Sequence, residues 1–132
     1  SAMIAQLCME QGIEVAYKAT IADDIGLLVS EIDRLSQAAD VLIVNGGLGP
    51  TSDDLTSEAL SRVIQVPIVE HPAAMAHLTQ WCSSRNYGLS DANKKQAMLP
   101  EGIDLVANAI GSAVGFKVEH NQCLVICTPG TA

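Results

Sequence analysis

An apolar run that leads directly into a glycine-rich segment constrains the fold of this chain most. Residues 41–44, Val-Leu-Ile-Val, form the short run typical of a central strand that is covered on both faces. The next ten residues, 45–54, include three glycines and carry little side-chain bulk. In open α/β sheets, ligands bind beyond the carboxyl ends of the strands. Residues 45–54 are therefore the first candidate for a ligand site.

Helix and strand patterns alternate through the first two-thirds of the chain, and strand patterns dominate the last third. The clearest amphipathic helix follows Asp23 and Asp24, which suit a cap and an acidic first turn. The other expected helices are 56–64, one that begins at Pro72, a short one at 91–98, and one that ends near Gly12; the expected strands are 13–17, 41–44, 67–69, 105–107, 113–119 and 123–127. This order predicts one α/β domain over residues 1–132, a three-layer α/β/α sandwich on a mixed, mostly parallel sheet.

The charge balance excludes several classes of partner. The 132 residues include 7 Lys or Arg and 15 Asp or Glu, for a net charge of −8. Nucleic acids and anionic membrane surfaces attract basic proteins, so neither is expected as a partner. The longest apolar runs match Cys123–Cys127 in length, far short of the roughly 20 residues of a membrane span. The four cysteines form no C-x-x-C pair and are expected to be small, buried or half-buried apolar residues of a cytoplasmic protein.

The glycine-rich segment combines an anion-binding backbone with two adjacent carboxylates. Gly46, Gly47 and Gly49 allow backbone N–H groups to approach a phosphate, although the spacing matches neither common phosphate-binding glycine motif. Asp53 and Asp54 would repel a phosphate unless a divalent cation bridged them to it. The combination indicates metal-assisted phosphate chemistry. The alternative is a tight turn in which Asp53 or Asp54 caps the next helix.

Four segments in order resemble the competence/damage-inducible CinA family, which is similar to the MoaB/Mog molybdopterin-binding domains. The segments are Gly46–Thr56, Asn93–Gly102, Asn108 with Gly111–Gly115, and Pro129-Gly130. Ser112 stands where the family has Thr, and Val114 where it has Pro. Compared with the family pattern, the first strand with its Gly-Thr-Glu loop and the C-terminal continuation are not in the sequence, which suggests a core fragment.

The resemblance implies hydrolysis of ADP-ribose to AMP and ribose 5-phosphate, with Asp54 as the catalytic residue. Asp53 and Asp54 would hold the divalent cation, which would be magnesium, manganese or cobalt. The residues expected to bind substrate or phosphate are Gly46, Gly47, Gly49, Thr51, Asn93, Gln96, Asn108, Gly111, Ser112, Pro129 and Gly130. For the three amide side chains, the alternatives are a helix cap, a solvent-facing residue and a turn residue.

The same resemblance leaves the ligand open between a nucleotide and a pterin, and it implies a homo-oligomer. One alternative function is molybdopterin binding or adenylyl transfer in molybdenum cofactor biosynthesis. Another is a non-catalytic module that binds nucleotide or mediates oligomerisation.

Overall fold

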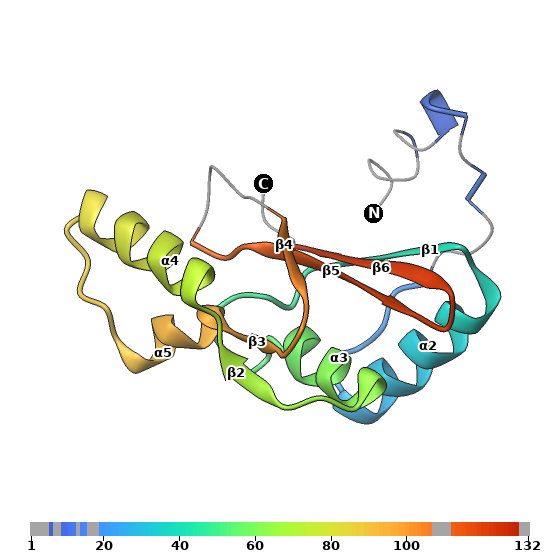
Figure 1. The fold of residues 1–132 in the computed structure, drawn as a ribbon, viewed down its shortest axis with the longest axis horizontal. Helices are drawn as coiled ribbons and strands as arrows, with labels where there is room; N and C mark the ends of the chain where they lie inside the picture. Colours follow the sequence, from blue (N-terminus) through green and yellow to red (C-terminus); the bar gives the residue numbers. More distant parts are fainter. Residues whose placement is uncertain (1–5, 7–8, 13, 16–18, 107–111, 130–132) are drawn as a thin grey trace.

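The computed structural model describes residue 6 and residues 9–12, 14–15, 19–106 and 112–129 (Figure 1). Its elements are α2 (Ile25–Ala38), β1 (Val41–Asn45), α3 (Thr56–Ile64), β2 (Ile68–Glu70), α4 (Pro72–Ser84), α5 (Asp91–Lys94), the 3-10 helix η1 (Lys95–Ala97), β3 (Met98–Pro100), β4 (Asp104–Val106), β5 (Gly115–His120) and β6 (Cys123–Thr128). The alternation of helices and strands confirms the α/β fold class. No described helix has the length and apolar character needed to cross a membrane.

The main sheet is mixed and has the strand order β1-β6-β5-β4. Strand β1 pairs parallel to β6, with Val41 opposite Leu124. Strands β6 and β5 pair antiparallel, as do β5 and β4, so antiparallel pairs outnumber parallel ones among the described strands.

The predicted central position of residues 41–44 is wrong within the described sheet, where β1 lies at the edge. Val41 is 51% exposed and Ile43 is 36% exposed, whereas Leu42 and Val44 are half-buried. The strand itself was predicted correctly, because four consecutive β-branched or aliphatic residues favour extended backbone. Each residue of β1 pairs with a residue of β6 that is 83 positions further along the sequence, and a local pattern carries no information on such a pairing.

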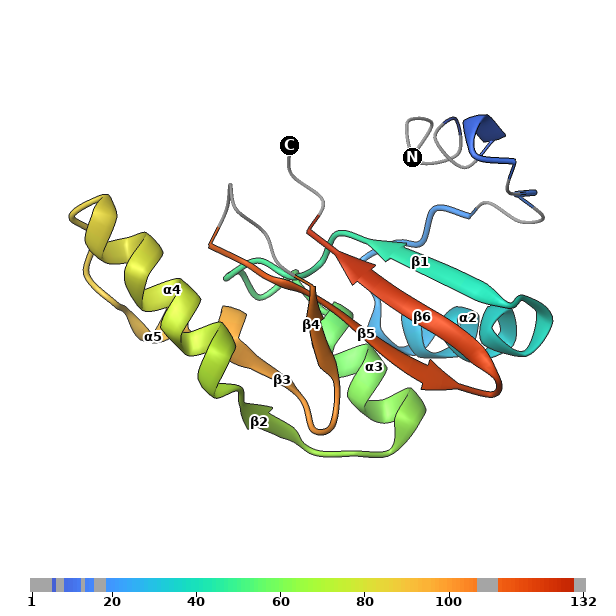
Figure 2. The ribbon, with the colours of Figure 1, turned by 45° about the horizontal axis from the view of Figure 1, so that its top comes forward.

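Helices α2 and α3 cover one face of the main sheet (Figures 1 and 2). That face carries Phe116, Cys123, Val125 and Cys127, each fully buried. The described cysteines Cys82, Cys123 and Cys127 are free thiols in the core, as predicted. Burial raises the pKa of the Cys127 thiol to about 12, so this side chain behaves as a small apolar residue.

The second, smaller sheet pairs β2 with β3 antiparallel, and α4 and α5 lie beside it (Figure 1). Pro72 is the first residue of α4, as expected from its fixed φ and missing N–H. The predicted helix at 91–98 is instead one turn of α-helix, one turn of 3-10 helix and the start of β3. The backbone N–H of His71 bonds to the carbonyl oxygen of Ala97 at 2.9 Å, which ties η1 to the start of α4.

The helix expected before Gly12 and the strand expected at 13–17 lie largely outside the described residues. Glu14 and Val15 are described and are not part of a strand. The helix after Asp24 is confirmed, because the Asp24 carboxylate accepts a hydrogen bond from the Leu27 N–H at 3.0 Å.

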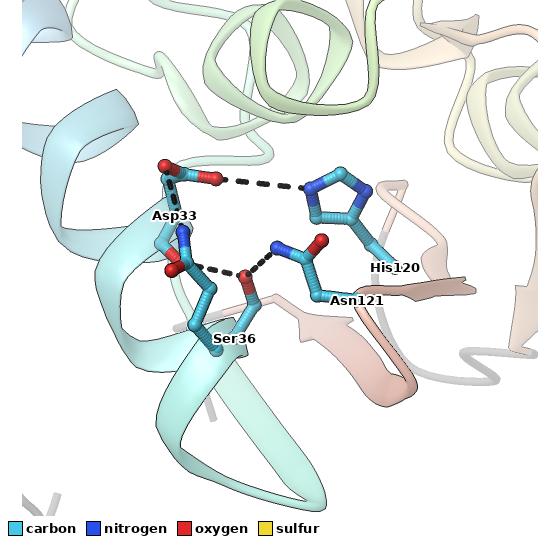
Figure 3. Close-up of polar contacts among 5 residues, drawn as sticks. Asp33, Ser36, His120 and Asn121 are labelled. Atoms are coloured by element: carbon cyan, nitrogen blue, oxygen red, sulfur yellow. Dashed lines mark hydrogen bonds and ion pairs between the residues drawn. The ribbon is translucent and has the colours of Figure 1, made fainter.

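A group of polar residues ties α2 to the turn between β5 and β6 (Figure 3). We call Asp33, Ser36, His120 and Asn121 the α2–turn cluster. The Asn121 side chain donates to Ser36 Oγ at 3.3 Å, and Ser36 Oγ donates to the Asp33 carbonyl oxygen at 2.8 Å. His120 Nε2 lies 3.8 Å from an Asp33 carboxylate oxygen. The cluster fastens the turn before β6 to the helix that covers the sheet.

Candidate functional site

The carboxyl ends of β1 and β6 meet at the start of the glycine loop, residues 46–55. The Gly46 N–H donates to the Thr128 carbonyl oxygen at 2.7 Å, and the Thr128 hydroxyl donates to Asn45 Oδ1 at 2.9 Å. Pro129 follows Thr128 directly and therefore lies at the same end of the sheet. Because the Gly46 N–H is occupied by Thr128, it is not free for a phosphate.

Thr56, the first residue of α3, holds the beginning of the glycine loop. Its hydroxyl donates to the Gly46 carbonyl oxygen at 2.8 Å, and its N–H donates to the Gly47 carbonyl oxygen at 3.1 Å. Gly47 has a φ of +73°, and a Cβ built there would lie 2.1 Å from Thr56 Oγ1. This approach requires glycine on both conformational and steric grounds.

The carboxylate of Asp54 organises the middle of the glycine loop. One oxygen accepts from the Thr51 N–H at 2.9 Å and from the Thr51 hydroxyl at 2.6 Å. A Cβ built on Gly49 would lie 2.8 Å from that same oxygen. The N-cap of α3 is Leu55 and receives no side-chain hydrogen bond, so the expected alternative of a helix cap at Asp53 or Asp54 is wrong.

Opposing effects act on the ionisation of Asp54. Partial burial raises the pKa of its carboxyl, but hydrogen bonds from the Thr51 hydroxyl and from the Thr51 and Gly49 backbone outweigh that effect. The positive charge of Lys95 acts in the same direction as these hydrogen bonds. The pKa therefore lies below its ordinary value, and Asp54 is an anion at neutral pH.

A hollow of about 260 Å³ opens beside this loop. It is lined by Gly47, Leu48, Gly49, Ser52, Asp54, Leu55, Ser57, Glu58, Ile68, Lys95 and Met98. Three predicted site residues, Gly47, Gly49 and Asp54, are in this lining, whereas Gly46, Thr51 and Asp53 are not. Thr51 contributes indirectly, since its N–H and hydroxyl both bind the Asp54 carboxylate.

The acidic side chains of the hollow suit one kind of metal site. Among the described residues, no group of three or more His, Cys, Asp or Glu side chains could hold a metal ion by itself. Magnesium is commonly held by one or two carboxylates together with substrate phosphates and water. Asp54 and Glu58 supply two carboxylates, although Glu58 also pairs with Arg62 at 2.9 Å. The donor set therefore fits a cation that binds together with a phosphorylated ligand.

Gln96 and Ser112 bring together two of the sequence segments that resemble the CinA family. The Ser112 hydroxyl donates to Gln96 Oε1 at 2.5 Å, and Gln96 is 5% exposed. The alternative of a solvent-facing Gln96 is therefore wrong. Neither residue lines the hollow, so their contact supports the position of η1 rather than forming part of the lining.

Asn93 occupies a local structural position. Its side chain donates to the Gly88 carbonyl oxygen at 3.4 Å, and its N–H bonds to the hydroxyl of Ser90, which caps α5. Ser90, not Asn93, is the helix cap. Asn108, Gly111 and Gly130 lie outside the described residues, and their predicted roles stay predictions.

Lys95 and Glu58 are the charged residues of the hollow that the sequence interpretation did not single out. Glu58 follows the glycine loop by one helical turn, a spacing that places it near the loop. Lys95 is next to Lys94, and nothing in the local sequence distinguishes the two. The structure separates them, because Lys94 is exposed and pairs with Asp91 at 3.9 Å, whereas Lys95 is half-buried and reaches the glycine loop.

The fold and the hollow define a class of α/β domain with a ligand pocket beside a glycine-rich loop at the carboxyl ends of the parallel strands. Residues 1–132 match the sequence model of the MoCF_biosynth family, described as "Probable molybdopterin binding domain". The chain therefore belongs to this family, and its fold is of the MoaB/Mog type.

The relatives are CinA-like proteins. The chain is 50% identical over 130 residues to a CinA-like protein of Colwellia psychrerythraea, which covers 98% of this chain and 30% of that protein. It is 38% identical over 130 residues to a CinA-like protein of Shewanella woodyi, which covers 98% of this chain and 31% of that protein. The chain thus spans about a third of the length of these curated relatives.

A solved structure agrees with the same family. The crystal structure of the protein CinA from Thermoplasma acidophilum, described as of unknown function, has a TM-score of 0.87 and 26% sequence identity. The similarity covers 98% of this chain and 76% of that one. The resemblance to CinA that the four segments indicated is confirmed.

Proposed function

We propose that this domain hydrolyses the pyrophosphate of ADP-ribose, using a divalent cation, to give AMP and ribose 5-phosphate. The observation that carries the proposal is the ionised Asp54 carboxylate in the wall of a hollow formed by a glycine-rich loop. The names of the relatives agree with the CinA resemblance from which the substrate is taken, and the family description points to a small organic ligand.

The chemistry requires one water and the cleavage of one P–O bond. The water oxygen bonds to one phosphorus, the bond from that phosphorus to the bridging oxygen breaks, and the bridging oxygen leaves with the second phosphate. A divalent cation, when bound, withdraws charge from the phosphate oxygens and favours attack at phosphorus. Asp54 and Glu58, which both line the hollow, would hold the cation, and Asp53, next to Asp54 in the sequence, remains a predicted ligand.

The other residues of the hollow bind and orient. Gly47 and Gly49 lack a Cβ, which lets Thr56 and the Asp54 carboxylate pack directly against the backbone of this wall. Leu48 is 5% exposed and anchors this wall in the core. Thr51 holds Asp54 by two hydrogen bonds and limits its rotation. Such fixed positioning is the main contribution that a protein makes to phosphoryl transfer.

The test is direct. We expect ADP-ribose incubated with the purified chain and magnesium, manganese or cobalt to give equal amounts of AMP and ribose 5-phosphate, resolved by ion-exchange chromatography. A chelator should stop the reaction, and excess cation should restore it. If a folded chain binds ADP-ribose but forms no AMP with any of the three cations, hydrolysis is contradicted and the nucleotide-binding module is favoured.

One observation favours a second function. The matching family is described as a molybdopterin-binding domain, which makes a pterin phosphate the competing ligand. Molybdopterin would then displace ADP-ribose from the hollow. With ATP, a phosphate oxygen of molybdopterin would bond to the α-phosphorus, and pyrophosphate would leave, which yields an adenylylated pterin. That product would place the chain with adenylyl transfer instead of hydrolysis.

A further inference from the structure

Lys95 reaches from η1 across to the glycine loop, more than 40 positions away in the sequence. Its Nζ donates to the Asp54 carbonyl oxygen at 2.6 Å and also bonds to the Thr51 carbonyl oxygen. The same side chain is part of the lining of the hollow. Lys95 therefore touches both the backbone that shapes the hollow and the space inside it.

In this turn, the hydrogen-bond acceptors of the backbone face a positive side chain, and the donors of Thr51 face a negative one. The carbonyl oxygens of Thr51 and Asp54 face the ammonium of Lys95. The Thr51 N–H and hydroxyl face the Asp54 carboxylate. Lys95 thus keeps two carbonyl groups, which would repel a phosphate, directed at a positive charge.

Lys95 is the positively charged residue among the described residues that line the hollow. The other charged side chains in the lining are the carboxylates of Asp54 and Glu58, and the described lining residues include no second cation. A pyrophosphate brings further negative charge to this space. Even with one divalent cation bound, a nearby ammonium lowers the cost of placing such a ligand there.

We propose that Lys95 is a positioning residue of the pyrophosphate site: it holds the glycine loop in its phosphate-accepting shape and supplies the charge that favours phosphorylated ligands. The inference rests on the proposed function, because it takes the hollow to be the site of the pyrophosphate. It adds a charged residue of η1 to a site whose other charged residues, Asp54 and Glu58, lie in the glycine loop and in α3.

The experiment compares Lys95→Met, Lys95→Arg and the matched control Lys94→Met in the full chain. Binding of inorganic pyrophosphate with magnesium is measured by calorimetry, and unfolding is followed by circular dichroism. Backbone hydrogen exchange at Thr51 and Asp54 reports the shape of the loop. We expect Lys95→Met to bind at least about tenfold more weakly, since a change of roughly 1.4 kcal/mol is one ionic hydrogen bond's usual effect.

Two further results are expected. Lys95→Arg, which keeps the charge and can bond to both carbonyls, should recover most of the affinity, and Lys94→Met should bind like the wild type. Exchange at Thr51 and Asp54 should be faster in Lys95→Met than in Lys94→Met. If Lys95→Met does not fold, Lys95→Gln replaces it, because its amide can still donate to one carbonyl oxygen while the charge is lost.

The outcomes separate this inference from the proposed function. Unchanged pyrophosphate affinity in a folded Lys95→Met or Lys95→Gln variant overturns the inference, even if loop exchange is faster. An equal loss in Lys94→Met overturns it as well, as does a wild type that does not bind pyrophosphate. A wild type that binds pyrophosphate, loses affinity in Lys95→Met and yet forms no AMP from ADP-ribose supports the inference and contradicts only the hydrolysis.

Discussion

Two polar clusters lie at opposite ends of β6, and one of them contributes residues to the lining of the hollow beside the glycine loop. At the end near Thr128, Thr51, Asp54 and Lys95 form a cluster beside the glycine loop. At the other end, the α2–turn cluster joins α2 to the turn before Cys123 (Figure 3). Both contain a carboxylate and a hydroxyl in a hydrogen-bonded network.

The two clusters differ in the surroundings and the hydrogen-bond partners of their carboxylates. In the α2–turn cluster, the Asp33 side chain is 50% exposed, and His120 Nε2 lies 3.8 Å from one of its carboxylate oxygens. Such a long, solvent-exposed pair contributes little to stability. In the loop cluster, the carboxylate is held by neighbouring backbone and hydroxyl donors against an open space. A hydrogen-bonded cluster thus indicates a site only when it borders a volume that a ligand can enter.

The substitution Asp54→Asn tests this comparison with the largest expected effect. Loss of the charge that would hold the cation should lower hydrolysis of ADP-ribose by about 3–4 kcal/mol in transition-state stabilisation, or roughly 10²–10³-fold in rate. Stability should change by about 1 kcal/mol or less, because the amide oxygen can still accept from Thr51. Steady-state formation of AMP and urea unfolding measure the two quantities.

The matched control is Asp33→Asn in the α2–turn cluster. It removes the same charge from a carboxylate outside the lining of the hollow beside the glycine loop, so turnover of ADP-ribose should equal that of the wild type. Equal losses of activity in the two variants would abolish the distinction between the clusters. Wild-type turnover in Asp54→Asn would remove Asp54 from the mechanism and leave the loop as a binding feature.

The substitution Gly47→Ala probes how tightly the loop is built. The new methyl group would meet Thr56 Oγ1 at 2.1 Å with φ at +73°, so we expect a loss of about 2 kcal/mol or more in the free energy of unfolding. Gly102→Ala, at φ +86° with no atom within 4 Å, isolates the backbone strain and should cost about 1–2 kcal/mol.

Gly88→Ala provides the unstrained control. Nothing lies within 4 Å of its Cβ position and its φ is not positive, so its stability should match or slightly exceed that of the wild type. Chemical denaturation of all three variants gives the comparison. Equal costs for Gly47→Ala and Gly102→Ala would show that the contact with Thr56 adds nothing to the backbone strain.

The smallest effect expected is a pH dependence of stability that belongs to Asp54. In the folded chain the pKa of this carboxyl lies below its ordinary value of 3.8, so its ionised form stabilises the fold. This stabilisation is fully present above the unfolded pKa of about 4 and is lost as the pH falls through the folded pKa. Unfolding of wild type and Asp54→Asn by urea, between about pH 3 and pH 6, should show a difference that shrinks on acidification.

The control for this measurement is Gly88→Ala, which keeps every titratable group. Its stability should follow that of the wild type at every pH. A difference between wild type and Asp54→Asn that does not vary with pH would show that the Thr51 bonds do not favour the ionised carboxylate.

Much of the secondary structure could be predicted because its causes are local. Asp24 and the apolar stripe after it specify α2, and Pro72 specifies the start of α4. Helix α3 begins and ends at the predicted residues. The 91–98 segment was harder, because a short helix that leads into Met98 is ended by strand pairing with β2, which the local pattern does not contain.

The residues of the candidate site likewise divide into those that the local sequence indicated and those that only the folded chain revealed. The glycines and Asp54 were recognisable, because a glycine-rich turn after an apolar strand is a local signal with a physical reason. Lys95 was not, since only the packing of η1 against the loop distinguishes it from Lys94. The contact of Gln96 with Ser112 likewise depends on two segments that meet only in the folded chain.

The sequence by itself determined helices α2 and α3, the start of α4, the strand at 41–44, the glycine loop and the family. The tertiary structure decided that β1 lies at the edge of the described sheet, that Asp54 binds Thr51 instead of capping α3, and that Lys95 faces the hollow. The physical reason is the separation along the sequence between the residues that interact. Backbone conformation and amphipathic patterns depend on neighbours within a few residues, whereas strand order and the partners of a charged side chain depend on segments that only packing brings together.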